Sequence, residues 1–291
     1  FANLVKSQLL VQPPKMEECP EFPNGGRKVL LFSDGRQKAA RLARDIPREV
    51  ELDSFRQALL LAAQRFEEIR KAPARPNIDL YLALVSVVSQ FNLQLFDGRD
   101  REDLLHAVQQ FRTKYDGNLK EALDERPTLT PPARYHEALL RQLCHPYFSL
   151  PAVTVAYVEP ARPERLIRCV KRVIPGVKDD TISALATAFI WEMLREYAFD
   201  RNISDSVRSK AAGYSRDTWG STATLNPRLI ENLSGDYGWD ERMWSQLHDV
   251  LRKELCTNKE GTYFLDPDQV ALKIALDTPW YQCQSCTQLA P

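Results

Sequence analysis

The sequence predicts a mainly α-helical fold with a small α/β part. Apolar residues recur at positions i, i+3 and i+4 along most of the chain, which is the spacing of an amphipathic helix. Two short runs, 29–32 and 152–160, are rich in strand-forming residues instead. The chain has 291 residues, of which 44% are hydrophobic and 27% charged, so it is long enough for one large or two modest domains.

The charges exclude a protein that is drawn as a whole to a polyanion. Lys and Arg together number 39, and so do Asp and Glu, so any binding of nucleic acid has to be local. No apolar run reaches the roughly 18 residues that span a bilayer, and the first residues lack the basic-then-apolar order of a signal peptide. We therefore expect a cytoplasmic protein without a membrane partner.

The first predicted element is the strand at 29–32, a continuous apolar run of the kind that is buried on both faces of a sheet. A turn at 33–35 leads from this strand into a helix at 36–44. Apolar periodicity predicts further helices at 52–66, 77–96, 104–111, 135–143, 163–174, 179–199, 227–234 and 240–255. The second strand is expected at 152–160, and a helix or short turns at 266–276.

The turn after the first strand is a candidate phosphate site. A helix that follows a buried strand presents its first N–H groups and its positive dipole end at the carboxyl edge of the sheet, where α/β folds bind ligands. Ser33 can donate to a phosphate oxygen, and Arg36 and Gln37 add a cation and an amide. Lys38 could extend this positive charge along a bound nucleic-acid strand. The alternative is that Ser33 and Asp34 cap the helix and Arg36 is solvated.

The same stretch, KVLLFSDGRQKAARLA, resembles motif IV in the second RecA-like domain of a group of large superfamily-2 DNA helicases. This group includes bacterial DISARM-type antiphage helicases and related proteins with a Cys-rich insertion. The family form is LLFSDSRQDAA, and its F-S-D-x-R-Q-x-A-A pattern is retained from Phe32 to Ala40. Gly35 replaces the usual Ser and Lys38 the usual Asp, and neither change forbids a phosphate contact.

The resemblance implies an order of segments along the chain. In these helicases a long helical insertion follows motif IV and leads to a zinc knuckle with the pattern W-Y/R-x-C-x-x-C. Residues 264–291 are similar to the lead-in to that knuckle, and 150–160 to a strand-like segment inside the insertion. The expected segments are a Pro-rich linker or arm at 1–24, the start of a second RecA-like domain at 25–70, a mostly helical insertion at 71–280 and the first half of a zinc knuckle at 281–291.

The motifs for ATP hydrolysis are missing from this sequence. It contains no Walker A loop, no D-E-x-H or D-E-x-D box and no Q-x-x-G-R-x-x-R arginine finger, so we expect no ATP hydrolysis by this chain alone. The resemblance implies a larger parent, an ATP-dependent helicase of antiphage defence that binds ATP and Mg²⁺ elsewhere. The implied partners are DNA, as a single strand or a duplex junction, the remaining helicase domains and other defence-system subunits.

Cys283 and Cys286 have the C-x-x-C spacing with which two thiolates can bind one tetrahedral Zn²⁺. A structural zinc site needs four ligands, and the remaining candidates are Cys256, Cys169 and the neighbours Cys144 and His145. A redox pair is the competing functional interpretation, and two unligated thiols are the structural one.

The loop between 208 and 226 is a second candidate for contact with nucleic acid. Its aromatic and basic residues alternate with Ser, Thr and Gly, and aromatic faces beside cations commonly hold single-stranded nucleic acid. They are Arg208, Lys210, Tyr214, Arg216 and Trp219. The alternative is that Trp219 and Tyr214 fold back onto the adjoining helices as packing anchors.

The sequence leaves two alternatives to a helicase segment. A non-catalytic helical module that binds another protein fits the amphipathic helices, with the turn at 33–35 purely structural. An independent enzyme ranks last, because the four histidines show no paired metal spacing and no catalytic set stands out.

Overall fold

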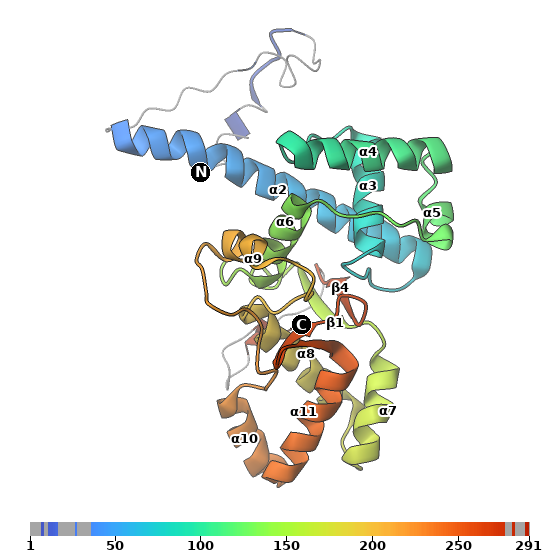
Figure 1. Cartoon of the computed structure of the whole chain (residues 1–291), viewed down its shortest axis with the longest axis vertical. Coiled ribbons are helices and arrows are strands. Elements are labelled where there is room, and N and C mark those ends of the chain that lie inside the picture. Colours follow the sequence, from blue (N-terminus) through green and yellow to red (C-terminus); the bar gives the residue numbers. More distant parts are fainter. Residues whose placement is uncertain are drawn as a thin grey trace. The chain divides into compact units, whose positions relative to one another are not determined.

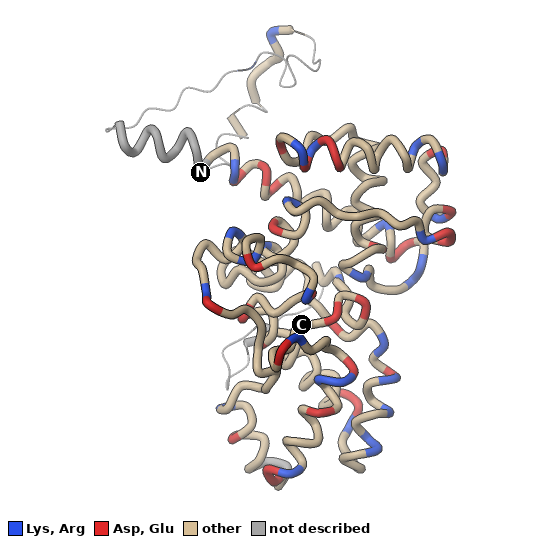
Figure 2. The backbone as a smooth tube through the Cα atoms, viewed as in Figure 1, with Lys and Arg blue, Asp and Glu red and all other residues tan. Residues whose placement is uncertain are grey.

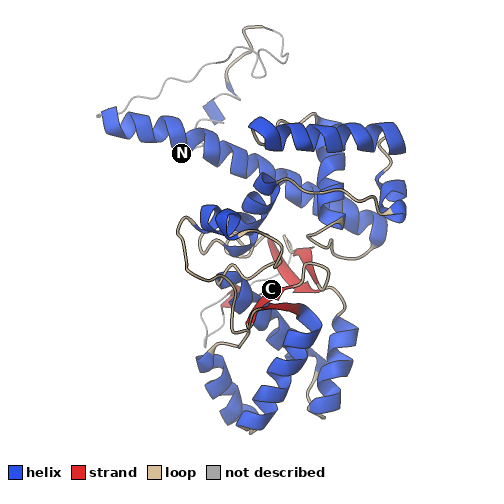
Figure 3. Cartoon of the chain, viewed as in Figure 1, coloured by secondary structure: helices blue, strands red, loops and turns tan. Residues whose placement is uncertain are grey.

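The computed structural model describes residues 7–8, 11–16, 27, 36–276, 281–282 and 289–290, and among these it leaves out the side chains of 36–45, 236–237, 281–282 and 289–290. The chain forms two compact units, Phe1–Gln57 and Ala58–Pro291. Figure 3 shows that helices dominate and that the strands are short, which confirms the predicted mainly helical fold. The predicted strand at 29–32 lies outside the described residues, and the predicted segment boundaries stay predictions.

The first long helix is α2 (Arg36–Arg70), with Pro47 inside it (Figure 1). The sequence predicts two separate helices here, at 36–44 and 52–66, and the structure joins them into one. Its C-terminal part belongs to the second unit, where Leu59, Ala62 and Phe66 are buried at helical spacing.

Four helices follow that build one part of the core of the second unit. They are α3 (Asp79–Phe91), α4 (Gly98–Tyr115), α5 (Leu119–Glu125) and α6 (Ala133–Cys144). Every residue of α3 from Asp79 to Val88 is buried, because α3 packs against both α4 and α5. Tyr135 of α6 fixes this layer: its ring packs edge-on against Tyr81 at 4.9 Å, and its hydroxyl donates to the carbonyl of Pro76 at 3.1 Å.

The remaining helices form the other part of this unit. They are α7 (Pro163–Val173), α8 (Asp179–Arg195), α9 (Asp205–Ala212), α10 (Pro227–Tyr237) and α11 (Glu241–Leu255). Ser204, Asn226 and Asp240 cap α9, α10 and α11 by accepting a backbone N–H with their side chains. All of these except α9 were predicted from apolar periodicity, and α9 and α5 are too short to show it.

The central strand pair joins segments that are far apart in the sequence. Strand β1 (Ala156–Pro160) runs antiparallel to β4 (Val270–Ile274), with Val158 opposite Leu272. The predicted strand is confirmed over 156–160, whereas 152–154 lie in a turn. Of the helix or short turns expected at 266–276, a turn forms at 266–269, where the side chain of Asp266 accepts the N–H of Asp268. Residues 270–274 form strand β4 instead.

A hairpin precedes this strand and was not predicted. Strands β2 (Cys256–Lys259) and β3 (Thr262–Leu265) are joined by Glu260 and Gly261, both with positive φ, 52° and 86°. This is the backbone of a type I′ turn, which the sequence shows less clearly because Glu stands where Asn or Asp is usual. A third pair, β5 (Tyr281–Gln282) and β6 (Leu289–Ala290), is also antiparallel.

Arg208 of α9 is a buried cation that contacts the segment after α8 and strand β3. Its side chain is fully buried, and its guanidinium donates to the carbonyls of Tyr197, Phe199 and Asp200 at 2.6, 2.8 and 2.5 Å. It also lies over the ring of Phe264 in β3, 4.7 Å from the centroid. Burial lowers the pKa of Arg208, and the three carbonyls hold the charge that burial disfavours.

No helix in the described part of the chain is both long enough and apolar enough to cross a membrane.

Replacing Arg208 with Met should lower the free energy of unfolding by about 3 kcal/mol or more, because buried carbonyls then lose their donor. Urea unfolding followed by circular dichroism measures this. The matched control is Arg201→Met, an exposed site nearby, where we expect a change within about 0.5 kcal/mol. Equal stability of Arg208→Met and the wild type would show that the carbonyls do not depend on this guanidinium.

Stability should also fall at acid pH. Burial lowers the pKa of His136, His145 and His248 below the usual 6.5. The unfolded chain therefore takes up protons first as pH drops through about 6.5, and the free energy of unfolding falls until the folded histidines titrate. Urea titrations at about pH 7 and about pH 5 should show this loss.

His248 allows a direct test of this pH dependence, since its Nε2 accepts the N–H of Leu225 at 3.1 Å. His248→Gln keeps an acceptor without a titrating group, so the loss of stability between the two pH values should shrink. The exposed His106→Gln serves as the control. An unchanged loss in His248→Gln would contradict the assignment.

Candidate nucleic-acid interface

The loop after α9 is anchored by Trp219. This indole is 4% exposed, stacks on Tyr214 at 5.8 Å between centroids and meets the edge of Tyr197 at 6.0 Å. The next residue, Gly220, has φ +116°, and a Cβ there would lie 2.8 Å from Cβ of Thr262. Only glycine lets the loop approach β3 so closely, so the position of Trp219 is fixed by packing.

The outer side of the same loop carries Tyr214 and Arg216. Tyr214 is 44% exposed, and the exposed Arg216 lies over the rings of Tyr214 and Trp219 at 5.3 and 5.5 Å. Arg216 pairs with Glu196 at 2.5 Å, and this hydrogen bond raises the pKa of Arg216. Of the residues predicted for this contact, Arg216 is accessible, whereas Trp219 has its ring covered and Arg208 is buried in α9. Contact of either with nucleic acid stays a prediction.

A second exposed aromatic group lies at the end of α6, in the turn 145–148, which we call the aromatic turn. Tyr147 and Phe148 are 75% and 64% exposed, although such side chains are usually buried. His145 holds them in place, because its Nδ1 accepts the N–H groups of both residues at 3.2 Å and its ring lies 4.9 Å from that of Phe148. Sequence reasoning missed this pair, since nothing in the pattern distinguishes exposed aromatics from buried ones.

Arg141 of α6 contacts α9 and also pairs with Glu137 of its own helix. Its guanidinium donates to the carbonyl of Lys210 at 2.6 Å. Its charge contributes to the lowered pKa of His145 and opposes the rise in the pKa of Tyr197, whose ring contacts Tyr214. Helices α6 and α9 pack against each other, and the exposed Tyr147, Phe148, Tyr214 and Arg216 lie in the segments that follow them. Aromatic faces beside cations hold single-stranded nucleic acid in other proteins, and such a contact stays a prediction for this chain.

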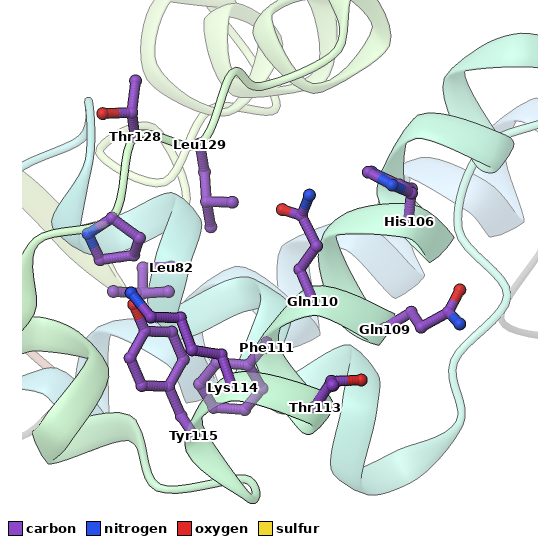
Figure 4. A pocket seen from close by; sticks show the side chains of 11 residues that line it. Leu82, His106, Gln109, Gln110, Phe111, Thr113, Lys114, Tyr115, Thr128 and Leu129 are labelled. Atoms are coloured by element: carbon purple, nitrogen blue, oxygen red, sulfur yellow. The ribbon is translucent and has the colours of Figure 1, made fainter.

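A cavity of about 600 Å³ opens beside α4 (Figure 4). Leu82, Phe111 and Tyr115 form an apolar side, and Gln110 extends toward Leu129. The residues that line it include no carboxylate and no thiol, and its ionisable side chains are His106, Lys114 and Tyr115. The cavity suits an apolar or planar group.

The predicted phosphate site is described only in part. Ser33 lies outside the described residues, as do Cys283 and Cys286 of the predicted zinc site. The described part of helix α2 begins at Arg36, and residues 36–38 are helical. The side chains of Arg36, Gln37 and Lys38 are not described, and their contact with phosphate stays a prediction.

The described cysteines do not form a metal site. Cys144, Cys169 and Cys256 are free, and no group of three or more His, Cys, Asp or Glu residues gathers around a possible metal position in the described ranges. Burial raises the pKa of the Cys144 thiol and raises that of Cys256 to about 12. Both thiols are therefore protonated near neutral pH without a metal, and zinc binding by Cys283, Cys286 and further ligands stays a prediction.

The fold and these surfaces define a mainly helical segment that carries exposed aromatic and basic side chains. Over 294 aligned residues the chain is 40% identical to Druantia protein DruE of Escherichia coli (strain UMEA 4076-1). The alignment covers 100% of this chain but 16% of DruE, so the chain spans a small part of that relative's length. No protein-family model matches the chain, and no solved structure matches it.

The aromatic turn can be tested by the double substitution Tyr147→Ala/Phe148→Ala. If bases stack on these rings, affinity for single-stranded DNA should fall by about 1–3 kcal/mol per lost stack, with little change in salt dependence. Fluorescence anisotropy measures both quantities. Phe91→Ala, at a site 51% exposed, is the control. Unchanged affinity in the double variant would remove the aromatic turn from the interface.

Proposed function

We propose that this chain is one segment of an ATP-dependent superfamily-2 DNA helicase or translocase that acts in antiphage defence. The segment contributes contacts to the nucleic-acid backbone and a helical accessory region. ATP and Mg²⁺ bind in other parts of the parent protein, where closure of two RecA-like domains moves the strand. Zn²⁺ is held by Cys283, Cys286 and further ligands of the parent.

The observation that carries this proposal is the motif F-S-D-x-R-Q-x-A-A from Phe32 to Ala40, of which residues 36–40 belong to α2. In the proposed strand-turn-helix arrangement, the first N–H groups of the helix have no helical partners and are available to a phosphate oxygen. Similarity to DruE along the whole chain supports both the defence role and a much longer parent. Other subunits of the same defence system are the proposed protein partners.

A second candidate function is a non-catalytic module that binds another protein, and the aromatic turn favours it. Tyr147 and Phe148 expose apolar surface that a protein partner could cover. Salt separates the two functions, because phosphate contacts weaken steeply as salt rises whereas apolar contacts do not.

The double variant Arg36→Ala/Gln37→Ala tests the predicted phosphate site. At low salt it should bind single-stranded DNA more weakly than the wild type, and the difference should shrink at moderate salt, because the lost contacts are ionic. Fluorescence anisotropy at both salt concentrations measures this. Gln94→Ala/Arg99→Ala removes the same two residue types from exposed positions and should bind like the wild type. Equal binding by all three proteins would assign the turn a structural role.

A further inference from the structure

Helix α7 and its flanks carry a local excess of positive charge, although the net charge of the chain is zero. Between Arg162 and Lys178 there are six cations and one carboxylate, Glu164, whereas the whole chain balances 39 against 39. Figure 2 shows Lys and Arg along α7, at the place where Figure 1 labels it. The cations are Arg162, Arg165, Arg168, Lys171, Arg172 and Lys178, and all are exposed.

Packing keeps these cations on one side of the helix. Leu166 and Val170 are buried, because this face of α7 packs against α11, α8 and β1. Arg165, Arg168 and Arg172 follow the i, i+3, i+7 spacing of a single opposite face. At 1.5 Å per residue this face presents charge over about 10 Å of helix axis, a length comparable to the rise of about three base pairs of duplex DNA, at about 3.4 Å each.

Most of this charge is not neutralised by the protein itself. Arg165 pairs with Glu254 at 2.8 Å, and Lys171 pairs with Asp179. Arg162, Arg168, Arg172 and Lys178 form no ion pair with any residue that the structure describes. Arg168 and Arg172 stand four residues apart, where like charges disfavour a helix. The described residues therefore leave positive charge on this face uncompensated.

We propose that the exposed face of α7, formed by Arg162, Arg165, Arg168 and Arg172, binds the phosphate backbone of DNA. The proposal rests on the proposed function for the class of polymer. It adds a surface within the helical region that is separate from the predicted phosphate site at the start of α2. Because the contacts are to phosphates, this surface binds without base preference, and its affinity depends steeply on salt.

The experiment compares four proteins by anisotropy on labelled single-stranded and duplex DNA at about 50 and about 200 mM salt. They are the wild type, Arg168→Glu/Arg172→Glu, Arg36→Ala/Gln37→Ala, and the matched control Arg99→Glu/Arg101→Glu. The control carries the same change in net charge on exposed residues in the first turn of α4. Arg168→Gln/Arg172→Gln removes the charges without placing acids in the last turn of the helix, and circular dichroism checks folding.

If α7 binds DNA, Arg168→Glu/Arg172→Glu should weaken binding about tenfold or more at low salt and reduce the slope of log K against log salt by about 1.4 to 1.8, the loss of two phosphate contacts. The Gln variant should show the same reduction in slope, and the Arg99→Glu/Arg101→Glu control should keep the wild-type slope.

Three results would overturn the proposal. In the first, the α7 variants bind like the wild type. In the second, the control weakens binding as much as the α7 variants do, which indicates only bulk charge. In the third, the wild type binds poly-glutamate but not DNA, which assigns the face to an acidic protein. Loss of binding in the α7 variants with no effect of Arg36→Ala/Gln37→Ala would support the α7 surface while rejecting the phosphate site at α2.

Discussion

The arrangement of the second unit depends on the buried guanidinium of Arg208. The turn at 197–200 ends α8 and pairs with β3, where the N–H of Leu265 donates to the carbonyl of Ala198 and the N–H of Asp200 donates to the carbonyl of Leu265. Two residues of this turn, Tyr197 and Asp200, have positive φ, 53° and 45°, which costs free energy for residues other than glycine. Arg208 compensates by binding the carbonyls that this backbone turns inward. Because Tyr197 also packs against Trp219, the same interaction positions the loop that carries Tyr214 and Arg216.

The features predicted correctly from the sequence are those that depend on the local periodicity of apolar residues. Long helices such as α8 and α11 repeat apolar residues over several turns, so their limits were found within a few residues. Strand β4 was missed because its stability comes from β1, more than one hundred residues away, and five residues hold too little pattern to identify a strand. The prediction for Arg208 was wrong for a related reason. The sequence placed it in a loop as a cation that could contact nucleic acid, whereas the tertiary fold buries it in α9 and brings three carbonyls around it.

In the candidate interface, too, the local pattern of residues does not predict contacts that the tertiary fold creates. Residue types predicted that the loop after α9 combines aromatics and cations, but they left open whether Trp219 packs or binds. The burial of Trp219 follows from Gly220, which lets the loop lie against β3, and neither residue reveals this alone. Exposure of Tyr147 and Phe148 depends on the hydrogen bonds that His145 makes across the turn. Such backbone contacts are set by the conformation of the turn, so a linear pattern of residues does not predict them.

A chain without net charge can still carry a local surface of one sign. Some cations of the second unit lie beside carboxylates, as in the pairs of Arg70 with Asp124 and Arg134 with Glu137. Along α7 only the two cations that reach Glu254 and Asp179 are paired, and the others face solvent. The net charge of the chain does not reveal such a surface. Salt screens charges beyond the Debye length of about 8 Å, so the attraction between a phosphate and the protein depends on the charges nearby. The balance of 39 against 39 and a basic helix are compatible for this reason.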